Sequence, residues 1–350
     1  MNKLRKELDS LREKYISIEQ MADALRVYPG FENIDRTTVW RWFKKPTKRT
    51  AAAIRVLKSK GEVAANLRIA EIESFWTLPS LMLSWAPEEG KPYGLLKKEW
   101  NVELKRESIG SFTKACERVY HDETDIALAP RTSLRTGPQF LCSIGRANVM
   151  CITRKKIQST WDLAGIRFAA PPDLFFYSAL RDTLDKGLFI VKPEDEKDSK
   201  RWELIAEKRP LFLSDAEGPE SCARQMKTKE IDGVIAWEPF LSMSKREAEK
   251  LGVRVFPAPP GTLGTVVVGL YVSHKAGPRA LRAYLWSLQK TIDYLNTKKS
   301  QEPFQAEIAS RFGIDRKDVE RTFSSIDWKL SDLNGNMILQ FWEREVSQKG

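Results

Sequence analysis

The chain has 350 residues, of which 42% are hydrophobic and 30% are charged, a composition typical of globular proteins and unlike that of disordered or fibrous chains. Its length favours two or three compact units over a single core. The formal net charge is +11, and its meaning depends on where the excess lies.

The positive charge is concentrated near the N-terminus. Residues 1–69 carry 16 Lys and Arg side chains against 8 Asp and Glu. Within residues 36–61 nine side chains are basic and none is acidic. A solvated surface usually mixes both signs, so this acid-free stretch favours a polyanion as partner.

The sequence predicts a cytoplasmic protein. Residues 1–20 lack the uninterrupted apolar segment of a secretory signal, and no segment approaches the roughly eighteen apolar residues of a membrane span. The four cysteines form no C-x-x-C pair, so we expect reduced, buried thiols with no metal site and no cofactor. They are Cys116, Cys142, Cys151 and Cys222.

Three helices are expected near the N-terminus. Apolar residues three or four positions apart predict the first over residues 4–15. Ser17 and Gln20 form a capping box that begins the second. Pro and Gly in residues 28–30 end that helix, because Pro lacks the amide donor and Gly tolerates positive φ.

The third helix is predicted over residues 36–43, with Asp35 as its N-cap. Its spacing allows Val39, Trp40 and Phe43 to be buried. The expected outward residues are Arg36, Thr37, Thr38, Arg41 and, less clearly, Trp42.

The segment ISIEQMADALRVYPGFENIDRTTVWRW resembles the helix-turn-helix of bacterial and phage regulators, in which a short x-x-T-V-x-R-W helix enters the major groove. Its connection, residues 27–35, is longer than the usual tight turn. The resemblance implies double-stranded DNA as partner, with outward residues facing base edges and basic residues neutralising phosphates. The candidate DNA-binding residues are Arg36, Thr37, Thr38, Arg41, Lys44, Lys45, Lys48 and Arg49.

Two other interpretations of this region remain open. It could form a small helical dimerisation or protein-docking module whose aromatic residues are core. Residues 44–49 could instead be a flexible basic linker that touches phosphates without sequence preference.

From about residue 69 onward the pattern is that of an α/β fold, because short apolar runs alternate with helical segments. The predicted strands are Glu71–Trp76, Val102–Leu104, Asp125–Ala129, Val149–Thr153, Ile166–Ala170, Gly233–Trp237 and Val266–Val272. The predicted helices are Tyr93–Trp100, Ser111–Tyr120, Phe175–Lys186, Glu220–Lys229 and Ser242–Leu251. Residues 300–345 are expected to form helices that close the back of the first lobe, or a dimer surface.

Four segments, in order, resemble the nitrate, sulfonate and taurine family of substrate-binding proteins of ABC transporters. YGLLKKEWNVELKRE is similar to the family's G-L-F-x-x-x-G-L-x-V-E-L segment, and ERVYHDETDIALAP to A-L-x-x-G-x-x-D-I-A. TWDLAGIRFAAPPDLFFYSALRDTLDKGL is similar to D-L-K-G-K-x-V-A-V, and KEIDGVIAWEPFLSMSKREAEKLGVRVF to G-x-V-D-A-x-x-x-W-E-P.

This resemblance implies a two-lobed type II periplasmic-binding-protein-like domain over residues 67–350, preceded by the all-α helix-turn-helix domain of residues 1–66. Lobe one is expected at about 67–150 and 260–350, and lobe two at about 151–259. The crossing strands are expected near Val149–Thr153 and Val266–Val272.

A small organic ligand is expected in the cleft between the lobes, where strands end and the next helices begin. Aromatic side chains there can sandwich a flat or apolar group, and polar ones can fix its ends. The charge of the ligand stays open, because Arg131 favours an anion whereas Asp173 and Glu238 favour a cation or a hydrogen-bond donor. The candidate ligand-binding residues are Trp76, Pro79, Ser80, Ser111, Phe112, Pro130, Arg131, Asp173, Phe176, Trp237 and Glu238.

Together these features predict a ligand-responsive, DNA-binding transcription regulator that works as a homodimer in the cytoplasm. Regulators of the LysR type also join a helix-turn-helix to this class of fold, but the motifs of this chain follow the transporter proteins. No nucleotide-binding, metalloprotease or nucleophile-elbow motif occurs, so no catalytic residue is assigned.

Two alternatives remain from the sequence alone. The chain could be a non-catalytic binding protein whose basic head docks another protein. It could also be an enzyme resembling the thiamine-pyrimidine synthase family, although that family's clustered cysteines are missing here and His121 and His274 carry no catalytic pattern.

Overall fold

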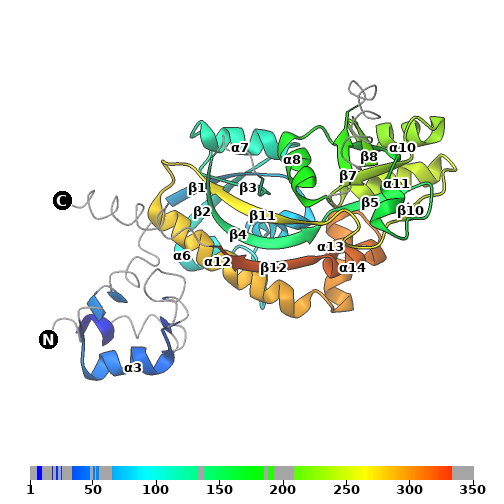
Figure 1. The fold of residues 1–350 in the computed structure, drawn as a ribbon. Coiled ribbons are helices and arrows are strands. Elements are labelled where there is room, and N and C mark those ends of the chain that lie inside the picture. The colour runs from blue at the N-terminus through cyan, green and yellow to red at the C-terminus, as the bar shows by residue number, and fades with distance from the viewer. Residues whose placement is uncertain are drawn as a thin grey trace.

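The computed structural model describes residues 6–9, 18, 21–22, 25, 34–47, 50–51, 53–54, 65–132, 138–184, 188–192 and 209–332. Within the N-terminal part, residues 6–9 are helical, and the helix whose bounds are described is α3 (Arg36–Lys44). Figure 1 shows α3 at one end of the molecule, far from strands β7 (Leu188–Val191) and β8 (Arg209–Asp215) at the other. No helix among the described residues has the length and apolar character that a membrane crossing requires.

The first sheet has six strands in the order β12-β4-β11-β3-β1-β2. Strand β1 runs parallel to β2 and β3, whereas β11 is antiparallel to β3 and β4, and β12 is antiparallel to β4. We call this sheet and its helices lobe one. Its strands are β1 (Ala65–Glu71), β2 (Val102–Ser108), β3 (Ile126–Pro130), β4 (Gln139–Asn148), β11 (Thr265–Val272) and β12 (Ile326–Ser331).

The second sheet also has six strands, in the order β10-β5-β9-β6-β8-β7. Strand β6 is parallel to β8 and β9, and β7 is parallel to β8, while β5 is antiparallel to both β9 and β10. We call this sheet and its helices lobe two. Its remaining strands are β5 (Met150–Thr153), β6 (Arg167–Ala170), β9 (Gly233–Ala236) and β10 (Phe256–Pro257).

The chain passes between the lobes twice. It leaves β4 at Asn148 and enters β5 at Met150, and it returns between β10 and β11. The amide of Val149 donates to the carbonyl of Gly264 at 3.1 Å, so the two passages lie side by side. Gly264 has φ +84°, and a Cβ there would lie 2.4 Å from the carbonyl oxygen of Thr183, so this position requires glycine.

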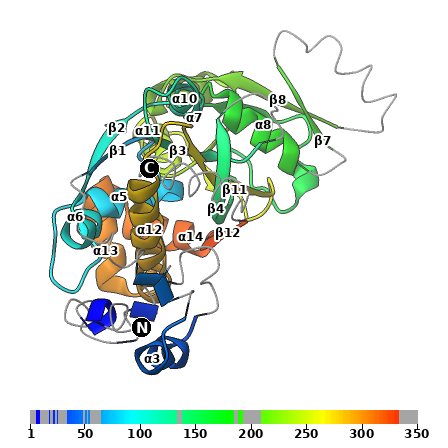
Figure 2. The same ribbon diagram turned by 90° about the vertical axis from the view of Figure 1, so that its left-hand side faces the viewer.

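Helices cover both faces of the first sheet. On one face α12 packs against α5, α6 and β1, and on the other α7 packs against β1 and β3. Figure 2 shows α12 running beside α5 and α6. The helices of lobe one are α5 (Leu78–Ser84), α6 (Leu95–Trp100), α7 (Phe112–Tyr120), α12 (Pro278–Lys298), α13 (Glu302–Phe312) and α14 (Arg316–Ser324), with the 3-10 turn η1 (Phe75–Thr77).

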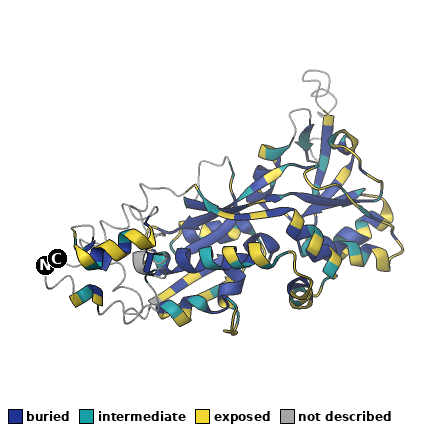
Figure 3. Ribbon diagram, turned by 90° about the horizontal axis from the view of Figure 1, so that it is seen from below, coloured by how far each residue is buried: buried dark blue, intermediate teal, exposed yellow. Residues whose placement is uncertain are grey.

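In lobe two, α10 and α11 pack on each other and on β9, while α8 contacts β3, β11 and α7 of lobe one. Helix α8 therefore belongs to the interface between the lobes. The elements are α8 (Leu174–Thr183), α10 (Pro219–Thr228), α11 (Phe240–Lys250) and the 3-10 turn η2 (Thr160–Leu163). Most strand residues in both sheets are buried, as Figure 3 shows in dark blue.

The structure corrects three expected elements. The first strand is Ala65–Glu71 rather than Glu71–Trp76. The Thr77 hydroxyl donates to the Ile72 carbonyl at 2.6 Å and closes a tight turn after the strand, and α5 begins at Leu78 with Pro79 in its first turn. Residues 326–331, expected to be helical, form β12, in which buried and exposed side chains alternate at its start. The crossing strands expected near Val149–Thr153 and Val266–Val272 are β5 and β11, each of which belongs wholly to one sheet, and the chain passes between the lobes in the connections before them.

Candidate functional site

Four of the predicted cleft residues form one aromatic cluster between the lobes. Trp76 and Phe112 come from lobe one, and Phe176 and Trp237 from lobe two. The ring centroids of Phe112 and Trp237 are 4.7 Å apart, those of Phe176 and Trp237 are 5.1 Å apart, and those of Trp76 and Phe112 are 5.9 Å apart. Each side chain is at most 4% exposed, so the rings are shielded from bulk solvent. We call these residues the interlobe aromatic cluster.

The positions of these rings follow from the α/β pattern. Trp76 lies in the turn after β1, Phe112 opens α7 after β2, Phe176 lies in the first turn of α8 after β6, and Trp237 follows β9. The carboxyl ends of parallel strands share one edge of a sheet, and here the corresponding edges of the two sheets face each other. The cluster is therefore where this fold places a ligand cleft.

Asp173 joins the lobes beside this cluster. As N-cap of α8, its carboxylate accepts the amide of Phe176 at 2.8 Å. The same carboxylate accepts the hydroxyl of Ser111 at 2.8 Å and the amide of Thr113 at 3.1 Å, both at the start of α7. One buried carboxylate thus satisfies amides at two facing helix N-termini, a position that favours negative charge.

A second contact between the lobes centres on Glu238, which directly follows Trp237. The backbone carbonyl of Glu238 accepts the amide of Phe75 at 3.1 Å. Its fully buried carboxylate accepts the amide and hydroxyl of Ser242 at 2.8 and 2.9 Å and pairs with Arg321 of α14 at 3.2 Å. Burial raises the pKa of Glu238, and the amide of Ser242 and the charge of Arg321 oppose that rise. The carboxylate is thus committed to other protein groups.

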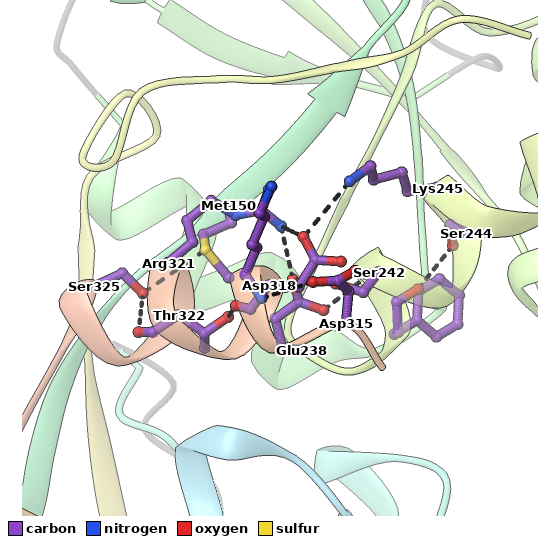
Figure 4. A network of polar contacts seen from close by, with 12 residues as sticks. Met150, Glu238, Ser242, Ser244, Lys245, Asp315, Asp318, Arg321, Thr322 and Ser325 are labelled. Atoms are coloured by element: carbon purple, nitrogen blue, oxygen red, sulfur yellow. Dashed lines mark hydrogen bonds and ion pairs between the residues drawn. The ribbon is translucent and has the colours of Figure 1, made fainter. Parts of the chain in front are cut away.

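Figure 4 shows that this network continues along the same boundary. Arg321 also pairs with Asp318 at 3.1 Å, and Lys245 of α11 lies 3.6 Å from the same Asp318 carboxylate. Helices α11 and α14, which belong to different lobes, are therefore tied by buried or half-buried charges. Of this network, only Glu238 was predicted from the sequence as a site residue.

Four other predicted ligand residues lie apart from the aromatic rings. Pro79 and Ser80 are buried within α5. Pro130 ends β3, and its carbonyl accepts the Tyr271 hydroxyl at 3.2 Å. Arg131 is exposed, with its guanidinium 4.6 Å above the ring of Phe140.

Sequence reasoning missed Thr113 and Phe75. Thr113 lies two residues after the predicted Ser111, and its amide and hydroxyl both reach Asp173. The first residues of a helix have backbone amides without a partner inside the helix. The position of Thr113 in the first turn of the predicted helix was therefore a signal that its amide could bind an acceptor. Phe75 packs edge-on against Phe312, with centroids 4.7 Å apart, and only the tertiary fold brings these residues together.

No group of three or more His, Cys, Asp or Glu side chains within the described residues is arranged to hold a metal ion. The four cysteines are free and buried. Burial raises the pKa of each thiol, which leaves them in the protonated, unreactive form at neutral pH.

Helix α3 has the predicted N-cap, because Asp35 accepts the amide of Thr38 at 2.6 Å. One expectation was wrong: Trp40 is 46% exposed, whereas Trp42 is 4% exposed and belongs to the core. Val39 and Trp42, three positions apart, define the buried face and rotate Trp40 outward.

Of the predicted DNA-binding residues, Arg36, Thr37, Arg41, Lys44 and Lys45 are exposed. Thr38 is half-buried. Lys48 and Arg49 lie outside the described residues. Within α3 itself no side chain is acidic, and the one carboxylate at its start is the exposed N-cap Asp35.

No protein-family model matches the chain, and no curated protein matches it in sequence. Its fold is similar to that of solved structures. The alkanesulfonate-binding protein SsuA from Xanthomonas axonopodis pv. citri, bound to MOPS, shares 15% identity at a TM-score of 0.50, over 80% of this chain and 90% of that one. The ligand-binding component of an ABC-type import system from Staphylococcus aureus, with zinc bound, shares 10% identity at a TM-score of 0.50, over 80% and 92%.

At this level of identity the likeness concerns the fold alone. It agrees with two six-stranded mixed sheets joined by two adjacent passages. The part of the chain built on these sheets has a two-lobed α/β fold similar to that of these two ligand-binding proteins.

Proposed function

We propose that the chain is a ligand-responsive, DNA-binding transcription regulator that senses a small organic molecule between its two lobes. The observation that carries the proposal is the interlobe aromatic cluster, to which each lobe contributes two side chains. A ligand that enters between these rings must change how the lobes meet. A change in the arrangement of the lobes would alter how the basic face of α3 on the same chain binds DNA.

The cluster favours a ligand with a flat or apolar surface. Aromatic rings bury large areas and stack on planar groups, which makes them common linings of ligand clefts. Ser111, Thr113 and Asp173 stand beside the rings, and a polar end of the ligand would have to replace the hydrogen bonds that these groups make with one another. The ligand shifts the equilibrium between lobe arrangements only in proportion to its preference for one of them.

The exposed face of α3 fits a DNA duplex as partner. Arg36, Arg41 and Lys44 project from a helix with no acidic side chain, and phosphate contacts provide most of the affinity of basic proteins for DNA. We expect a homodimer in the cytoplasm, since two heads would match two half-sites, and no catalytic role.

The test of DNA binding is fluorescence anisotropy with short duplexes of random sequence, titrated with the full chain between about 50 and 200 mM salt. The variant Arg36→Ala/Arg41→Ala/Lys44→Ala should bind more weakly, with a salt slope smaller by about 3, because each lost phosphate contact lowers the slope by about 0.9. The matched control, Arg224→Ala/Lys227→Ala/Lys250→Ala on exposed helix positions of lobe two, removes the same charge and should bind like the wild type. Equal loss in both variants would contradict a DNA face on α3, and no binding by the wild type would favour a protein-docking role.

The test of ligand sensing uses the same probe. Compounds from a library of small aromatic and aliphatic molecules are first selected by their effect on the melting temperature. A selected compound should then change the DNA affinity of the wild-type chain, because sensing requires coupling between the two sites. A compound that stabilises the protein but leaves DNA affinity unchanged would show binding without regulation.

A further inference from the structure

Trp40 stands at the centre of the exposed face of α3. It is 46% exposed, although tryptophan usually hides most of its ring. Arg36 and Thr37 lie one turn before it, and Lys44 lies one turn after it. A large apolar side chain is therefore surrounded by basic and polar ones on the surface proposed to meet DNA.

Lys44 contacts the indole ring of Trp40. Its ammonium lies 3.9 Å from the ring centroid, within the range of a cation–π contact. This contact leaves part of the ring uncovered, as the exposure of Trp40 shows. The ring is thus presented to a partner in a defined orientation rather than folded back onto the core.

We propose that Trp40 makes a direct apolar contact with the DNA duplex, against deoxyribose or thymine methyl groups, while the basic residues around it pair with phosphates. The inference rests on the proposed DNA binding. Thymine methyl groups and sugar edges are the apolar surfaces of a duplex, and side chains from a groove-bound helix reach them. The positive face matches the phosphates on either side, so the partner is a nucleic acid rather than an apolar protein groove.

The contact has a distinctive physical signature. Affinity that comes from phosphate contacts falls with salt, because neutralised phosphates release counterions. Affinity that comes from burial of an indole ring is independent of salt to first order. Loss of Trp40 should therefore weaken binding by a similar factor at every salt concentration.

The experiment measures the affinity of full-length variants for random-sequence duplexes as a function of salt. Trp40→Ala should weaken binding roughly tenfold or more, with an unchanged salt slope, as expected for loss of the burial of about half an indole ring. Trp40→Phe should retain part of the affinity, since it keeps an aromatic face. Lys44→Ala should instead lower the salt slope by about 1.

Trp161 provides a matched control. It is 50% exposed in η2 of lobe two, and the guanidinium of Arg209 lies 5.6 Å from its ring centroid. Trp161→Ala therefore removes the same kind of exposed ring with a nearby cation and should leave DNA affinity unchanged. Because both tryptophans are exposed, neither substitution should lower the melting temperature appreciably.

The outcomes separate this inference from the function on which it rests. If Lys44→Ala lowers the salt slope but Trp40→Ala binds like the wild type, DNA binding stands and the role of Trp40 is wrong. A lower salt slope in Trp40→Ala would also contradict a direct contact of Trp40 with DNA, because the ring would then act only by positioning Lys44. If the wild type shows no salt-dependent binding, the proposed function itself fails.

Discussion

The guanidinium of Arg321 lies 3.2 Å from the carboxylate of Glu238, which is completely buried. Glu238 follows β9 in lobe two, and Arg321 belongs to α14, which packs on β12 of lobe one. One ion pair thus connects the lobes next to the interlobe aromatic cluster, because Glu238 directly follows Trp237 of that cluster in the chain. Any movement of the lobes that separates α11 from α14 must break it.

Removal of Arg321 should destabilise the protein strongly. Arg321→Met leaves the Glu238 carboxylate buried without its cation, and such a change typically costs about 3–5 kcal/mol. The double variant Arg321→Met/Glu238→Gln should recover much of the loss, because no uncompensated charge remains. Urea unfolding of both variants measures the difference. Equal stability of the single and double variants would show that the unpaired charge of Glu238 is not the cause of the loss.

Loss of the Asp173 carboxylate should loosen the contact between the lobes. Asp173→Ala removes an N-cap of α8 together with the bonds from Ser111 and Thr113. The cap alone is worth about 0.5–2 kcal/mol, so the total loss of stability should exceed that range. Asp315→Ala is the control, since Asp315 caps α14 through one bond to Lys317 within its own helix start.

Small-angle scattering distinguishes the two variants. The radius of gyration should rise for Asp173→Ala, because the lobes separate more often, and should stay at the wild-type value for Asp315→Ala. The same increase in both would mean that the change reflects general destabilisation rather than a broken lobe contact.

Much of the fold could be predicted from patterns in the sequence. Alternating strands and helices predicted an α/β domain, and the rule that ligands bind at strand ends selected all four rings of the interlobe aromatic cluster. The α/β class and the meeting of the four rings could be predicted because both depend on chain order and on strand ends, whereas the role of the rings in ligand binding stays a prediction. Neither property requires knowledge of side-chain direction.

Predictions that needed side-chain direction were less successful. In α3, helical spacing allows Val39 to be buried together with either Trp40 or Trp42. The tertiary packing buries Trp42. Glu238 was expected in the cleft, but its carboxylate turns to Ser242 and Arg321. The partner on α14 is remote in sequence, so no local pattern indicates it.

Several elements were also absent from the predicted set. The strands β4, β7 and β8 and the long helix α12 were not anticipated, and β12 was expected to be helical. The apolar residues of β12, among them Ile326 and Trp328, are too few to separate a strand period from a helical one. Pairing with β4 settles the conformation of this segment.

Trp237→Ala should affect both stability and ligand binding. Truncation of a buried tryptophan typically costs about 3–5 kcal/mol, because a cavity remains. Trp328 is a matched control, because it is 1% exposed in β12 and lies outside the interlobe aromatic cluster. Its truncation should lower the free energy of unfolding by a similar amount. Thermal-shift titration with a selected ligand should show lost affinity only in Trp237→Ala. Equal affinity of both variants would place the ligand elsewhere.

The buried carboxylate of Glu71 should make stability depend on pH. Glu71 ends β1, is fully buried, and lies 2.9 Å from the guanidinium of Arg106. Burial raises its pKa from 4.5 to about 7, and the charge of Arg106 only partly opposes the rise. Since the folded state then binds this proton more tightly than the unfolded state, the free energy of unfolding should fall as pH rises from 4.5 to about 7.

Urea unfolding at several pH values in this window tests the expectation. In Glu71→Gln the decline should be smaller than in the wild type, by up to about 1.4 kcal/mol per pH unit. Glu73→Gln is the matched control, because Glu73 pairs with the same Arg106 at 2.7 Å but its side chain is 57% exposed. A Glu71→Gln profile that follows the wild type would show that the buried carboxyl does not titrate in this range.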